Sequence, residues 1–111
     1  MANSFKNTLN SQVGTADVTV YTPSNGVSYS TIIGYTVANV TSGNIAVDLF
    51  IRDTDSTEVY LLKGTNIEPG QALVPVGGEQ KLVVLPNQQV CVRSNTNSSA
   101  DVTISVLEIS N

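Results

Sequence analysis

The chain has 111 residues, with 5 basic and 9 acidic side chains, a net charge of −4, no histidine and one cysteine. This length fits a single domain with one modest core, and the negative charge argues against binding to nucleic acid or to an anionic membrane surface. The lack of histidine excludes a Ser-His-Asp triad and histidine metal ligands, and a lone cysteine excludes a disulfide within the chain.

Two kinds of targeting signal are missing from the sequence. The N-terminal residues have no apolar stretch of the kind that forms a signal peptide, and no segment approaches the ~20 apolar residues of a membrane helix. Together with the single cysteine, this indicates synthesis in a reducing cytosol.

Residues 1–14 are polar and predict an N-terminal arm ahead of a β-sandwich domain over residues 15–111. Phe5, Leu9 and Val13 recur every four residues, which is the spacing of one helical face, although the Asn and Ser around them are weak helix formers. We therefore expect one or two helical turns at most. The arm should lie on a surface, either its own sheet or a neighbouring subunit.

After residue 15, short runs of alternating apolar and polar residues are separated by turn signals, as in β-strands. The predicted strands are residues 16–21, 31–40, 45–52, 58–62, 72–76, 81–85, 88–94 and 101–109. The fold class predicted is all-β, an antiparallel two-sheet β-sandwich of about eight strands, with jelly-roll and immunoglobulin-like strand orders both open.

Three turn signals connect these strands. Asn25-Gly26 is the strongest short hairpin signal, and Gly77-Gly78 also permits the positive φ angles of a hairpin turn. Residues 53–56 predict a hairpin with an acidic tip.

Period-two placement predicts one core, with Asp17, Thr19 and Tyr21 facing outward from the first predicted strand. The predicted core residues are Val18, Val20, Ile33, Val37, Val47, Leu49, Val84, Val90, Val92, Ile104 and Val106. Residues 31–40 are partly apolar on both faces, which suggests that one face contacts a partner. The predicted partner-binding residues are Phe5, Leu9, Val13, Ile32 and Tyr35.

The candidate chemical sites are weak. Cys91 lies in a predicted strand with no histidine to activate it, so a buried structural thiol is favoured over a nucleophile. Asp53, Asp55 and Glu58 alternate as in a calcium loop, but the glycine and the final glutamate of that loop are missing. We predict no cofactor, no metal site and no catalytic residue.

The four tyrosines leave one alternative open. They can form a platform for a sugar, but tyrosines scattered over strands are more often ordinary sheet residues. These residues are Tyr21, Tyr29, Tyr35 and Tyr60.

Several phrases of the sequence resemble a family of small virion proteins of tailed bacteriophages, of the type found in marine and cyanobacterial phages. The resemblance is carried by NSFKN, TIIGYTVANVTSGNIAVDLFIRDT, VYLLKGTNIEPGQALVPVGGEQKLVVLPNQQVCVRSN and VTISVLEIS, which together span nearly the whole chain. It implies a structural subunit of the particle and contributes no catalytic residues.

From this resemblance we expect a non-enzymatic virion protein, made in the host cytoplasm, that serves as a capsid decoration or cement subunit. The expected partners are the phage major capsid protein or another virion protein, and further copies of the chain, with a trimer suggested by analogy to phage decoration proteins. The alternative is a neck, tail or fibre component that binds a receptor or carbohydrate. A small hydrolase is nearly excluded because the sequence offers no histidine.

Overall fold

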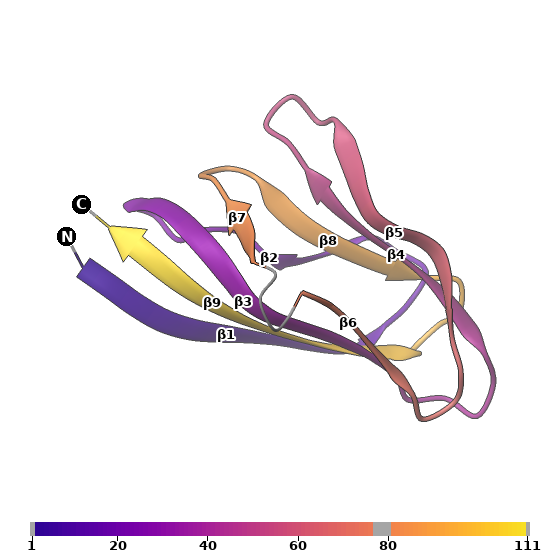
Figure 1. The fold of residues 1–111 in the computed structure, drawn as a ribbon. Coiled ribbons are helices and arrows are strands. Elements are labelled where there is room, and N and C mark those ends of the chain that lie inside the picture. Colours follow the sequence, from indigo (N-terminus) through magenta and orange to yellow (C-terminus); the bar gives the residue numbers. More distant parts are fainter. Residues whose placement is uncertain (1, 77–80, 111) are drawn as a thin grey trace.

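The computed structural model describes residues 2–76 and 81–110, and in them the chain forms two antiparallel β-sheets that pack face to face (Figure 1). The predicted all-β sandwich is therefore confirmed. The strands are β1 (Ala2–Val13), β2 (Val18–Tyr21), β3 (Val27–Asn39), β4 (Ile45–Arg52), β5 (Glu58–Ile67), β6 (Ala72–Val76), β7 (Leu82–Val84), β8 (Gln89–Ser94) and β9 (Ala100–Ser110). The described residues contain no helix long and apolar enough to cross a membrane.

Sheet A has the order β1-β9-β3-β6, with β7 also paired to β3, and sheet B has the order β2-β8-β4-β5. The pairs β1–β9, β2–β8 and β4–β5 are nested in the sequence, so the chain folds as one long antiparallel ribbon wrapped into two sheets. Consecutive strands at the start of the chain alternate between the sheets. This is the arrangement of a jelly roll, which decides between the two strand orders left open by the sequence.

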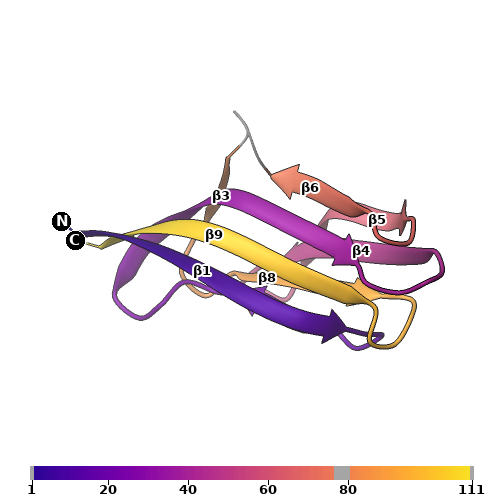
Figure 2. The ribbon, with the colours of Figure 1, turned by 90° about the horizontal axis from the view of Figure 1, so that it is seen from below.

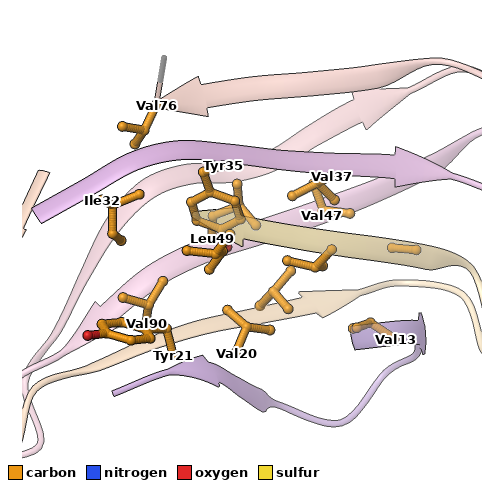
Figure 3. Close-up of a cluster of buried hydrophobic side chains, with 14 of the residues drawn as sticks. Val13, Val20, Tyr21, Ile32, Tyr35, Val37, Val47, Leu49, Val76 and Val90 are labelled. Carbon is orange, nitrogen blue, oxygen red and sulfur yellow. The ribbon is translucent and has the colours of Figure 1, made fainter. Parts of the chain in front are cut away.

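The core lies between the sheets and consists mainly of valine, isoleucine and leucine from the inward positions of both (Figure 3). Most of the predicted core residues belong to it, and these are Val20, Val37, Val47, Leu49, Val84, Val90, Val92, Ile104 and Val106. Val18 is half-buried and packs against this cluster. Ile33 does not belong to it, and its prediction was wrong.

Two β-bulges explain why some side chains were predicted on the wrong face of their strand. The register between β3 and β9 shifts between Ile32 and Gly34, so Ile33 faces outward while Ile32 and Tyr35 both enter the core. The register between β2 and β8 shifts between Thr19 and Tyr21, which turns Tyr21 inward rather than outward. A bulge inserts one residue and breaks strict alternation, and nothing in the apolar pattern marks where it falls.

The segment predicted as an arm is strand β1, which pairs with β9 along the edge of sheet A (Figure 2). The expected helical turns are wrong. Pairing with β9 engages the backbone groups on one side of this segment without requiring helix-forming residues, and Val13 at its end is buried in the core.

The turn signals had different outcomes. The hairpin with the acidic tip is confirmed, because β4 pairs with β5 and the Asp53 N–H donates to the Thr57 carbonyl at 2.8 Å. Asn25-Gly26 forms a turn but not a hairpin, since β2 lies in sheet B and β3 in sheet A. The predicted turn at Gly77-Gly78 lies outside the described residues.

Candidate partner-binding surface

The outer face of sheet A carries most of the exposed apolar side chains. Of the eight large hydrophobic residues that are exposed in the described chain, five lie on strands of this sheet and only one on a strand of sheet B. The five are Phe5, Leu9, Tyr29, Val74 and Val83. Scattered apolar residues are normal on a protein surface, so their concentration on one sheet is the informative observation.

The strand register lines several of these residues up in one row across the sheet. Phe5 of β1 lies opposite Leu107 of β9, Leu107 lies opposite Thr31 of β3, and Thr31 lies opposite Val83 of β7. Residues that are directly opposite on neighbouring strands share a face and lie about 4.5–5.5 Å apart. The row is therefore a continuous, uncharged band.

A second row runs parallel to the first through Leu9, Thr103 and Thr36. Between the two rows is an open hollow of about 440 Å³, which is lined by Phe5, Lys6, Asn7, Ile33, Ser105 and Val106. The bulge that removes Ile33 from the core places it in this hollow. The outer face of sheet A thus offers apolar side chains around a shallow depression, without charged groups in these rows.

The structure divides the five predicted partner-binding residues into two groups. Phe5 and Leu9 are 76% and 69% exposed and lie on this face. Val13, Ile32 and Tyr35 are buried in the core, so their assignment to a partner surface is corrected. Both faces of β3 are apolar because a bulge changes the facing along the strand, and this gave the false impression of an apolar outer face at Ile32 and Tyr35.

One end of the sandwich is closed by a buried carboxylate that the sequence analysis missed. Glu108 of β9 is an inward-facing residue, only 4% exposed, and the Tyr21 hydroxyl donates to its Oε2 at 2.6 Å. The Ser24 hydroxyl donates at 3.2 and 3.1 Å to its two oxygens, and Lys6 Nζ lies 3.4 Å from Oε1. The Tyr21 hydroxyl also lies 2.5 Å from the Ser30 hydroxyl.

These contacts determine the charge of Glu108. Burial alone raises its pKa, but the hydrogen bonds from Tyr21 and Ser24 and the positive charge of Lys6 outweigh burial, so its pKa lies below the usual value. Burial and the bond to Glu108 raise the pKa of Tyr21, which keeps its hydroxyl protonated as a donor. Each carboxylate oxygen is engaged, which is the arrangement of a structural ion pair rather than of a general base awaiting a substrate.

The outer face of sheet B, in contrast to that of sheet A, is charged. Arg93 donates from Nε to Asp48 Oδ2 at 2.8 Å, from Nη1 to Asp17 Oδ1 at 2.9 Å and from Nη2 to the Tyr60 hydroxyl at 2.7 Å. Arg52 lies 3.2 Å from Asp17 as well. These hydrogen bonds engage all three guanidinium nitrogens of Arg93, and its positive charge is already balanced by the carboxylates of Asp48 and Asp17.

Phe50 explains why these charges gather here. Its ring is fully buried on the outer side of sheet B, with the guanidinium carbons of Arg52 and Arg93 5.6 and 5.1 Å from its centroid and Tyr60 5.2 Å away. Arginine covers an aromatic face favourably, so the two side chains shield the ring from water. Strand alternation placed Phe50 on this outer face, with Arg52 and Asp48 two residues away on either side, and that spacing was the available signal.

The other candidate sites offer little chemistry. Cys91 is buried, and burial raises the pKa of its thiol, which disfavours the reactive thiolate. In the described residues, no group of three or more His, Cys, Asp or Glu side chains could hold a metal ion. The four tyrosines form no common platform, since Tyr21 and Tyr35 are in the core while Tyr29 and Tyr60 lie on different sheets.

Comparisons with known proteins bear on the fold. No family model matches the chain, and no curated protein matches it. The fold is similar to that of a chain in a solved structure described as "Bacillus endospore appendages form a novel family of disulfide-linked pili", with a TM-score of 0.58 and 8% sequence identity. The similarity covers 98% of this chain and 89% of that one. At this identity the comparison concerns the fold alone.

Proposed function

We propose that this protein is a non-enzymatic structural subunit of a tailed-phage virion, a capsid decoration or cement protein that binds the particle through the outer face of sheet A. It acts there as a homo-oligomer. The observation that carries the proposal is the uncharged apolar face formed around Phe5 and Leu9.

The energetics of this face favour a contact with protein. Covering an exposed large apolar side chain contributes about 1.5–3 kcal/mol, so Phe5 and Leu9 together supply a useful part of a binding free energy. The hollow between them can receive a side chain from the partner. A flat sheet with apolar residues and hydroxyl groups suits attachment to a large surface better than capture of a small molecule, which needs a deeper cleft.

Two similarities support assembly as the role. The sequence resembles small virion proteins of tailed phages over nearly its whole length. The fold resembles that of a protein whose described role is in pili, which are also assemblies of protein subunits. The alternative, a neck, tail or fibre module that binds a carbohydrate or receptor, has less support because the tyrosines are dispersed.

The test is binding of purified protein to particles that lack the native protein. Deleting residues 1–13 is unsuitable, because β1 pairs with β9 and Val13 belongs to the core. A double variant, Phe5→Ser with Leu9→Ser, changes only exposed side chains and should fold normally. We expect it to lose most particle occupancy, by about tenfold or more if the two side chains contribute as estimated.

The matched control is Val59→Ser, which removes a 60% exposed apolar side chain from β5 of sheet B. It should decorate particles at wild-type occupancy. If the double variant also reaches wild-type occupancy, the outer face of sheet A is not the binding surface and the proposal fails.

A further inference from the structure

Strand β1 is a long edge strand with one open side. It has 12 residues and pairs with β9 without a register shift from Ala2 to Asn10 (Figure 2). The backbone groups along its other side have no strand to pair with in the described chain. Edges of this kind invite pairing with another strand, so proteins usually protect them with charges, prolines, bulges or short length.

The remaining edges of both sheets have such protection. In sheet A, β7 has three residues and β6 contains Pro75. In sheet B, β2 has four residues and a register shift, and β5 carries Lys63, Gly64 at φ +61° and two register shifts against β4. In β1 the first irregularity comes only after Asn10.

The single charged residue of β1 does not protect the edge either. The Lys6 side chain is 47% exposed and reaches to the Glu108 cluster, where its ammonium group lies 2.7 Å from the Ser24 hydroxyl and 3.4 Å from Glu108. Thr8 also faces inward and donates to the Val20 carbonyl at 2.8 Å. The outward positions Phe5, Asn7 and Leu9 are exposed and uncharged.

We infer that two copies of the chain pair β1 to β1 in antiparallel orientation, around a two-fold axis at Asn7, and so join their A sheets into one continuous sheet. The inference rests on the proposed function in one respect only, which is the expectation that the chain forms a homo-oligomer. It does not depend on a phage particle. A second copy is the occupant because an antiparallel edge is self-complementary under a two-fold axis. Each chain has a net charge of −4, but the two copies meet along a strand whose one charged residue, Lys6, is already paired with Glu108.

The sequence of β1 fits this register. With Asn7 opposite Asn7 of the partner subunit, Phe5 lies opposite Leu9 of the partner subunit, and Leu9 lies opposite Phe5 of the partner subunit. Cross-strand pairs of an aromatic and an aliphatic residue are favourable. The two side chains remain on the outer face, so the dimer presents the apolar residues of both copies on one continuous surface.

The seam is small. Residues 3–11 span about 30 Å at roughly 3.4 Å per residue, and one strand pair buries less than the ~1,000 Å² typical of a stable interface. We therefore expect a weak dimer in solution that becomes important when copies are crowded on a surface. The test must trap it.

A disulfide at the axis provides that trap. In the Asn7→Cys variant the two cysteines lie opposite each other at about 4.5–5.5 Å between Cα atoms, within the range of a disulfide. The matched control is Thr103→Cys, an exposed position on the same face of neighbouring β9. Its copies lie three strand spacings apart across the seam, about 14 Å, and are also offset along the strands because Thr103 pairs with Leu9 rather than with Asn7, so they are too far apart for a disulfide. Cys91 is buried in both variants.

Under mild oxidation, we expect Asn7→Cys to form a covalent dimer on a non-reducing gel and Thr103→Cys to stay monomeric. Preferential cross-linking of Thr103→Cys indicates face-to-face packing and overturns the inference. Equal cross-linking of both variants, or none, also overturns it. The assay contains no particles, so its failure leaves the particle-binding test of the proposed function unaffected.

Substitutions that introduce a charge at Asn7 give an independent test of the β1–β1 pairing. Asn7→Asp and Asn7→Lys each place like charges opposite each other, which should weaken self-association by about fivefold in sedimentation. An equal mixture of the two variants pairs opposite charges and should restore association. A mixture that stays as weak as either variant alone contradicts a two-fold axis at Asn7.

Discussion

Two buried tyrosines provide a matched pair for measuring what the Glu108 cluster contributes to stability. The Tyr21 hydroxyl donates to Glu108 Oε2 at 2.6 Å and lies 2.5 Å from the Ser30 hydroxyl. The Tyr35 hydroxyl is also buried, but none of the described residues forms a hydrogen bond with it. The same substitution, Tyr→Phe, therefore removes a bonded hydroxyl at one position and an unbonded one at the other.

The expected magnitudes differ in sign. A hydrogen bond to a charged group contributes roughly 1.5–3 kcal/mol, so Tyr21→Phe should lower the free energy of unfolding by about that amount. Removing a buried hydroxyl without a partner relieves a desolvation cost, so Tyr35→Phe should be neutral or stabilising by up to about 1 kcal/mol. Both variants keep the aromatic ring, so the packing of the core changes little.

The assay is urea unfolding at pH 7, with the slope of free energy against urea checked for each variant. An unchanged slope shows that the difference in midpoint reports stability. If Tyr35→Phe loses as much stability as Tyr21→Phe, the hydrogen bonds to Glu108 do not contribute as argued, and the cluster is incidental to the fold.

Three further predictions concern pH, the core and calcium. Folding lowers the pKa of Glu108, so its stabilising effect is present above the unfolded value of about 4.3 and is lost as the pH falls through the folded pKa. Glu108→Gln should therefore reduce this acid dependence of the unfolding free energy. Leu49→Ala should lower the free energy of unfolding by about 2–5 kcal/mol in urea, because Leu49 is fully buried. The control Leu85→Ala, at a 49% exposed position, should change it by no more than about 0.5 kcal/mol. Equal losses would contradict the assignment of the core. Millimolar calcium should leave the melting temperature unchanged, and a rise of several degrees that Asp53→Ala abolishes would show a calcium site at the acidic tip.

The sequence was sufficient for the fold class because alternation of apolar residues survives in most strands. It predicted the facing of β4 correctly, with Val47 and Leu49 toward the core. It failed where a bulge adds a residue, as at Ile33 and beside Tyr21, because the local pattern looks the same whether the strand is regular or bulged.

Long-range pairing accounts for the other failures. The spacing of Phe5, Leu9 and Val13 resembles a helix, and only the presence of β9, about a hundred residues later in the chain, makes that segment a strand. In the sequence, Glu108 is one polar residue within an apolar strand. Its partners Tyr21, Ser24 and Lys6 come from the opposite end of the sequence. The candidate surface was predicted in part, since Phe5 and Leu9 were identified but the bulged Ile33 was not.

The two ends of the described chain lie side by side, with Ala2 opposite Ser110 in the β1–β9 pair (Figure 1). A force that pulls these ends apart acts across the strands and opens the pair one set of hydrogen bonds at a time, like a zipper. A force along the strands would instead load many bonds at once. A jelly roll of this topology is therefore mechanically weak when it is pulled by its two ends and stronger when the load runs along its strands.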